Sequence, residues 1–87
     1  MRTEKEIEEQ IKKGQEFIKE HPKSMFGDDN VKQFNVFLKI IEKFKKGKSL
    51  ESIEDFVADA YEDDDEEIYG HAMATIDWLR GTEETIY

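Results

Sequence analysis

The sequence predicts an all-α protein, a small bundle of about four helices that forms a single domain over residues 1–87. Two observations carry this prediction. Apolar residues recur at helical spacing in four separate stretches, and no run alternates between apolar and polar residues as a strand does. Residues 30–46 are the most apolar and most regular of these stretches. We therefore expect them to form a central helix against which the other helices pack.

The first helix is expected to begin directly after Thr3. Thr3 and Glu6 have the spacing of a capping box, in which the hydroxyl and the carboxylate each accept a hydrogen bond from a backbone amide. A glycine on an apolar helix stripe costs about 1 kcal/mol of helix propensity, so we expect Gly14 to allow the close approach of another helix. Pro22 ends the helix near residue 20. The predicted apolar stripe is Ile7, Ile11, Gly14 and Ile18.

The central helix is expected to follow a loop at residues 22–29, with Asp28 or Asp29 as its N-cap. In that loop, Met25 and Phe26 are predicted to plug the end of the core. Gly47, behind several lysines, is predicted to end the helix. Val36 and Ile40 widen the apolar face, which predicts neighbours on two sides. The main face is Phe34, Phe37, Leu38, Ile41 and Phe44.

Two shorter helices complete the predicted bundle. Ser49 is expected to cap the third helix, and Asp64 with Glu67 could form a capping box for the fourth. Gly81 is expected to end the fourth helix. Residues 82–87 then form a tail, which Ile86 and Tyr87 could tuck against the core, and its deletion should cost little helicity. The predicted inner faces are Leu50, Ile53, Phe56, Val57 and Ala60 in the third helix, and Ile68, Ala72, Ile76 and Leu79 in the fourth.

Composition excludes several classes of protein. The chain has no cysteine, so it has no disulfide framework and no thiolate nucleophile. No apolar run approaches the roughly 20 residues of a membrane span. The charged N-terminus lacks the apolar region of a signal peptide, which leads us to expect a cytosolic protein.

Charge is distributed unevenly along the chain. The net charge of −9 divides into +3 for residues 1–50 and −12 for residues 51–87, where Arg80 is the only base. Such an asymmetry between halves suggests a charged partner.

A resemblance appears in two short segments. The turn Phe26-Gly27-Asp28-Asp29-Asn30 and the later segment Trp78-Leu79-Arg80-Gly81 resemble a group of small acidic, helical proteins encoded by phages and bacterial genomes. The resemblance spans most of residues 3–84. It implies a helical fold and an association with mobile elements, and it implies no particular activity.

Catalysis and metal binding find little support in the sequence. His21 and His71 are the only histidines, and no serine lies in a nucleophile motif, so we predict that the chain is not an enzyme and needs no cofactor. The acids near Asp28 lack the ligand spacing and the central glycine of a calcium loop. Weak cation association along the acidic run is the most that we expect.

The lysines that end the central helix permit two interpretations. They could contact nucleic acid, or they could form a solvated helix terminus that suits the helix dipole. The net negative charge of the chain opposes direct binding to DNA. These lysines are Lys39, Lys43, Lys45, Lys46 and Lys48.

The acidic half leads to a sharper hypothesis. Carboxylates one turn apart on a rigid helix could replace DNA in the basic groove of a nucleic-acid-binding protein. Alternatively, the acids only keep the protein soluble. Trp78 lies off the main apolar stripe of its helix, so it either completes a wide core face or is an exposed anchor for a partner. The candidate partner-binding residues are Asp55, Asp59, Glu62, Asp63, Asp64, Asp65, Glu66, Glu67 and Trp78.

The sequence thus leads to two hypotheses of function. In the first, the chain is a non-enzymatic protein-binding module, such as a phage or mobile-element inhibitor whose acidic surface occupies a host nucleic-acid-binding protein. In the second, it is a structural protein that self-associates, with the basic central helix of one copy meeting the acidic half of another.

Overall fold

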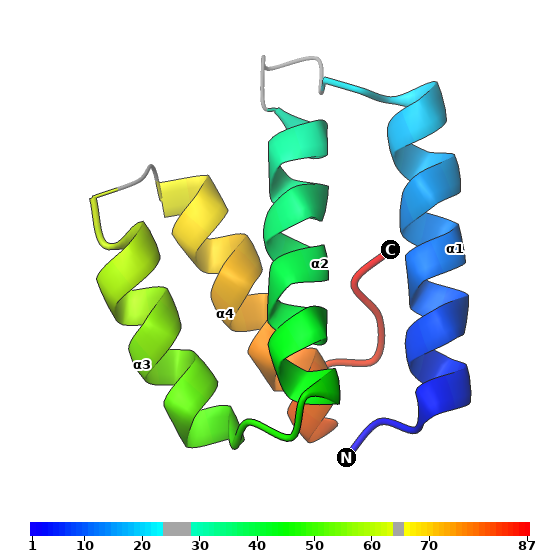
Figure 1. The fold of residues 1–87 in the computed structure, drawn as a ribbon. Coiled ribbons are helices and arrows are strands. Elements are labelled where there is room, and N and C mark those ends of the chain that lie inside the picture. Colours follow the sequence, from blue (N-terminus) through cyan, green and yellow to red (C-terminus); the bar gives the residue numbers. More distant parts are fainter. Residues whose placement is uncertain (24–28, 64–65) are drawn as a thin grey trace.

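The computed structural model describes residues 1–23, 29–63 and 66–87. It contains four helices, which are α1 (Glu4–Glu20), α2 (Asn30–Lys45), α3 (Leu50–Tyr61) and α4 (Glu66–Arg80). Among the described residues there is no strand, only an isolated bridge between Lys23 and Asp29. The helices form one bundle with α2 in its middle (Figure 1). This confirms the predicted all-α fold of about four helices.

Helices α1, α2 and α3 begin directly after the capping residues predicted from the sequence. The Thr3 hydroxyl accepts from the Glu6 amide, and the Glu6 carboxylate accepts from the Thr3 amide, which completes the capping box. The side chain of Asp29 accepts a hydrogen bond from the Lys32 amide at the start of α2, and Ser49 caps α3 in the same way. Among the candidate capping residues, Asp28 and Asp64 lie outside the described residues, as do Met25 and Phe26 of the predicted plug.

Glycines follow two of the helix ends. Gly47 lies two residues beyond α2 with φ of 87°, and Gly81 lies directly after α4 with φ of 97°. Both angles are in the left-handed region that side chains other than glycine rarely adopt. The helix ends predicted at these two positions are therefore confirmed.

The core forms around α2, which packs against each of the other three helices. Phe37 and Ile40 of α2 are fully buried, and Val36 on a neighbouring face is 5 % exposed, so the expectation of neighbours on two sides is confirmed. The buried apolar residues are Ile7, Phe34, Val36, Phe37, Ile40, Ile41, Leu50, Ile53, Val57, Ile68, Ala72, Ile76, Trp78 and Leu79.

Gly14 lies at a point of close contact between α1 and the core. A Cβ atom added there would lie 2.3 Å from Cε1 of Phe34 and 3.1 Å from Cδ2 of Tyr87. Both distances are too short for an unstrained contact. The predicted close approach at this glycine is therefore confirmed, and the chain beyond α4 takes part in it as well as α2.

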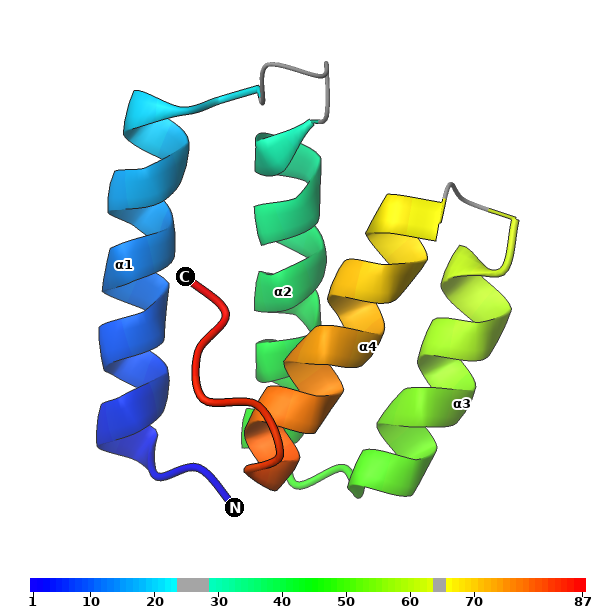
Figure 2. The ribbon, with the colours of Figure 1, turned by 180° about the vertical axis from the view of Figure 1, so that it is seen from behind.

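The segment after α4 is tucked against the core, which is one of the two arrangements expected from the sequence. Residues 82–87 run between α1 and α4, as the reverse view shows (Figure 2). Ile86 and Tyr87 pack against the core, so the segment is not a loose tail. The expectation that its deletion costs little helicity stays a prediction, and it rests on Gly81 alone. Gly81 ends the helix, but the chain beyond it returns to fill the space beside α1.

Candidate functional site

The acids of α3 are arranged as a stripe on its outer side. Glu51, Asp55 and Asp59 are spaced four residues apart, and Asp63 continues the spacing in the turn after the helix. All four are exposed. We call these four residues the acidic stripe. Glu51 was missed by the sequence analysis, although its i, i+4 relation to Asp55 is the signal that would have found it.

The fold of α3 explains why the stripe faces outward. Leu50, Ile53 and Val57 are all buried in the core, and they share one face of the helix. Helical geometry places the acidic stripe on the opposite face. Since Ser49 caps the helix and its inner face is packed, the carboxylates project from a well-supported backbone.

The other predicted acids lie close to the stripe in the sequence. Glu62 follows α3 directly, and Glu66 and Glu67 form the first turn of α4, where carboxylates suit the positive end of the helix dipole. All three residues are exposed. Asp64 and Asp65 lie outside the described residues.

The acids of this half that form ion pairs lie outside the stripe. Arg80 pairs with Glu54 of α3 and with Asp77 one turn earlier in α4. Within the described part of the chain, Asp55, Asp59 and Asp63 take part in no ion pair. Arg80, the single base of the acidic half, thus forms its ion pairs with acids outside the stripe. Among the described residues, no ion pair offsets the charge of the stripe residues named above.

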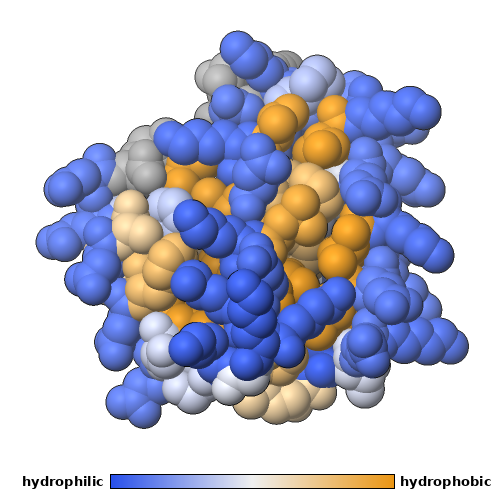
Figure 3. Space-filling view, in the orientation of Figure 1, coloured by the Kyte–Doolittle hydropathy of each residue, from blue (hydrophilic) through white to orange (hydrophobic). Residues whose placement is uncertain are grey.

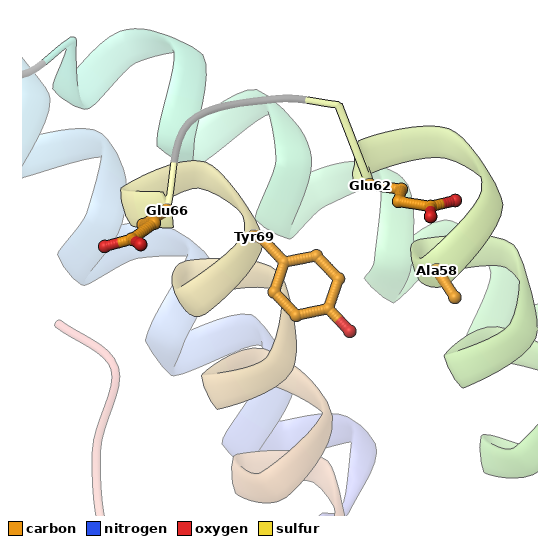
Figure 4. Close-up of a pocket in the computed structure, with 4 residues that line it drawn as sticks. All are labelled: Ala58, Glu62, Glu66 and Tyr69. Atoms are coloured by element: carbon orange, nitrogen blue, oxygen red, sulfur yellow. The ribbon is translucent and has the colours of Figure 1, made fainter.

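A shallow groove of about 410 Å³ lies between the ends of α3 and α4, lined by Ala58, Glu62, Glu66 and Tyr69. The Tyr69 ring points from α4 toward Ala58, while the carboxylates of Glu62 and Glu66 point away from each other (Figure 4). Tyr69 is 38 % exposed. The groove therefore offers an aromatic surface next to the acids, and it does not bring these two carboxylates together as a pair.

The basic end of α2 is partly engaged with α3. The Nζ of Lys43 lies 4.1 Å from the centroid of the Phe56 ring, and the Nζ of Lys39 lies 5.7 Å from it. Lys46 pairs with Glu42 on its own helix. Part of the lysine cluster thus covers an aromatic side chain within the molecule, and Lys45 and Lys48 remain exposed.

An apolar seam is exposed between α1 and α2 on the face shown in Figure 3. A groove of about 340 Å³ there is lined by Ile11, Leu38 and Ile41, with Glu42, Lys45 and Lys46 at its rim. A neighbouring hollow of about 310 Å³ lies at the start of α1, beside Phe44. The two hollows share Lys45, so they are adjacent along the seam.

Trp78 is a core residue. It is 1 % exposed, and its ring meets that of Phe37 edge-on with 6.2 Å between centroids. The guanidinium of Arg2 lies 5.1 Å from the indole centroid, and Arg2 Nε donates to the Trp78 carbonyl at 2.8 Å. The interpretation of Trp78 as an exposed partner-binding anchor is therefore wrong, and the alternative that it completes a wide core face is confirmed.

The two histidines differ in environment. His71 is largely buried, and its Nε2 lies 2.9 Å from the Tyr87 hydroxyl. Burial lowers the pKa of His71 below its ordinary value, because desolvation penalises the charged imidazolium. His21 is exposed at the end of α1. Residues 1–23, 29–63 and 66–87 contain no group of three or more acidic or histidine side chains placed to hold a metal ion.

Comparisons with known proteins found no counterpart. No family model, no curated protein and no solved structure matches the chain. Within the described residues, no helix is both long enough and apolar enough to span a membrane.

Proposed function

We propose that this chain is a non-enzymatic protein-binding module that presents its acidic stripe to the basic groove of a nucleic-acid-binding protein. The observation that carries the proposal is the outward-facing acidic stripe of α3 and its following turn, which forms no ion pair among the described residues, in a half of the chain with net charge −12. An inhibitor encoded by a phage or mobile element is the biological setting suggested by the sequence resemblance.

The spacing of the stripe supports a partial imitation of nucleic acid. Residues four apart in a helix rise by roughly 6 Å, whereas one DNA strand carries a charge about every 3.4 Å. The stripe alone is therefore sparser than a DNA strand. Glu62, Glu66 and Glu67 add charge beside it, and the exposed ring of Tyr69 adds apolar contact area. A partner should accordingly use both a basic groove and an apolar contact.

Neutralising the stripe is expected to weaken partner binding by at least about tenfold while leaving stability level or higher, because repulsion among like charges falls. The wild-type affinity should also fall steeply with salt. The measurement is a competition titration, in which a labelled DNA duplex and this protein compete for a DNA-binding protein captured from the source cell. The test variant is Glu51→Gln, Asp55→Asn, Asp59→Asn and Asp63→Asn.

A matched control distinguishes the effect of losing the stripe from the effect of a lower net charge. Four exposed acids of α1 can be neutralised instead, so both variants change the net charge from −9 to −5. The control should compete for the partner like the wild type. If the stripe variant still displaces DNA as well as the wild type, or the control loses as much affinity, the proposal is wrong. The control variant is Glu8→Gln, Glu9→Gln, Glu16→Gln and Glu20→Gln.

Self-association is the second candidate function, and the opposite net charges of residues 1–50 and 51–87 favour it. If the basic half of one copy meets the acidic half of another, the mass in solution should exceed one copy at low salt. It should fall to one copy as salt screens the charges. Size exclusion with light scattering measures this, and a single-copy mass at low salt would contradict self-association.

A further inference from the structure

The space between α1 and α4 is filled by residues 82–87 rather than by helix-to-helix contact. Within the described residues, α1 packs on α2 and makes no direct packing contact with α3 or α4. Both ribbon views place the segment after α4 beside α1 (Figures 1 and 2). We call the space that residues 82–87 occupy the segment groove.

One end of the segment groove is lined by aromatic rings that surround Tyr87. The Tyr87 ring lies 5.3 Å from Phe37 and 5.6 Å from Phe34, centroid to centroid, in edge-on geometry. His71 also lies at this end, with its Nε2 at 2.9 Å from the Tyr87 hydroxyl. Gly14 makes room for the ring, since a Cβ there would lie 3.1 Å from Tyr87 Cδ2.

This end of the groove selects a neutral phenol. Burial raises the pKa of the Tyr87 hydroxyl above its ordinary value and lowers that of His71, because both charged forms lose hydration there. A neutral imidazole and a neutral hydroxyl can share one hydrogen bond without a buried charge. An alanine in place of Tyr87 would leave the space of the ring empty and would remove this hydrogen bond.

The rest of the groove binds backbone atoms of the segment and one of its hydroxyl groups. The side-chain amide of Gln10, 7 % exposed, accepts from the Tyr87 amide through Oε1 at 3.1 Å and donates to Thr85 Oγ1 at 3.2 Å. Near the other end, the Arg2 guanidinium donates to the Glu83 carbonyl. Gln10 thus holds the segment through the Tyr87 amide and the Thr85 hydroxyl, whereas Arg2 contacts only the backbone carbonyl of Glu83.

We propose that the segment groove binds residues 82–87 of a second copy of this chain in exchange for its own. The chain's own residues 82–87 fill it in cis, and the same segment of a second copy can fill it in trans. Such an exchange reproduces every contact of the cis arrangement, so it needs no new interface chemistry. The site is separate from the acidic stripe and does not depend on the function proposed for it.

The test uses the full-length chain carrying Tyr87→Ala and a fluorescein-labelled peptide with the sequence of residues 81–87. In the wild type, the cis segment competes at an effective concentration on the order of millimolar. We therefore expect the peptide to bind the Tyr87→Ala chain at least about tenfold more tightly than the wild type. Fluorescence anisotropy measures both affinities.

Two controls define the specificity of this binding. A peptide with alanine at its last position should bind neither chain. A Tyr69→Ala chain, which loses an exposed tyrosine outside the groove, should bind the peptide as weakly as the wild type. Equal affinity of the peptide for wild type and Tyr87→Ala, or equal binding of the alanine peptide, overturns the proposal.

A rescue experiment tests the proposal if the Tyr87→Ala chain fails to fold. In that case millimolar peptide should restore the helical circular dichroism signal, and no recovery overturns the proposal. The variant with a neutralised acidic stripe should bind the peptide as the wild type does. Failure of this proposal is therefore distinguishable from failure of the acidic-surface function.

Discussion

Replacing Phe37 by alanine is expected to cost about 3–5 kcal/mol of unfolding free energy, among the largest losses available to any single change in this chain. Phe37 is fully buried in the middle of α2. Its ring lies 5.8 Å from Phe34, 6.2 Å from Trp78 and 5.3 Å from Tyr87, between centroids. The substitution therefore empties a site where α2, α4 and the segment after α4 meet. A loss of this size is most of the stability of a small domain.

Urea unfolding followed by the fluorescence of Trp78, the only tryptophan, measures this loss directly. Phe17→Ala is the matched control, because it deletes the same side chain from a position that is 39 % exposed. Its loss should be clearly smaller. A loss below about 1 kcal/mol for Phe37→Ala, the range of ordinary surface changes, would contradict the packing described here.

Trp78→Ala is expected to have an effect of the same size, about 3–5 kcal/mol, since it too removes a buried aromatic side chain. The variant would also lose the contact between the indole ring and the Arg2 guanidinium, which helps to hold the N-terminus against α4. Trp78→Phe should retain much of the stability, because it keeps an aromatic ring next to Phe37. Urea unfolding followed by circular dichroism measures these losses.

This experiment also separates a core residue from a partner-binding one. If Trp78 acted as an exposed anchor, alanine would leave the unfolding free energy unchanged and would lower only the affinity for a partner. Tyr69→Ala provides the contrast on the same helix, because that side chain is 38 % exposed. Its stability change should stay within about 0.5 kcal/mol. Equal stability of Trp78→Ala and wild type would show that the burial described here is wrong.

The acidic stripe was only partly predictable. The sequence identified Asp55 and Asp59, because acids four residues apart in a helical segment must share a face. It did not show which acids would be paired within the molecule. Glu54 is next to Asp55 in the sequence, yet it meets Arg80 from α4, and this pairing depends on how α3 and α4 pack.

The sequence by itself determined the four helices, the starts of α1, α2 and α3, and the ends of α2 and α4. The caps Thr3, Asp29 and Ser49 each accept from the amide three residues on, and Gly47 and Gly81 act through their own backbone angles. Such interactions are local, so they can be read without knowing how the helices pack. The same holds for the apolar face of α2, which repeats at the helical period.

Only the tertiary structure decided where Trp78 and Tyr87 lie. Trp78 is buried because Phe37 and the N-terminal Arg2 both pack against it, which gives α4 a wider inner face than its apolar period indicates. Tyr87 is held by Gln10, 77 residues away in the sequence, and lies next to Gly14. No local pattern encodes such contacts, because they exist only once α1 and α2 have formed the space that the segment fills.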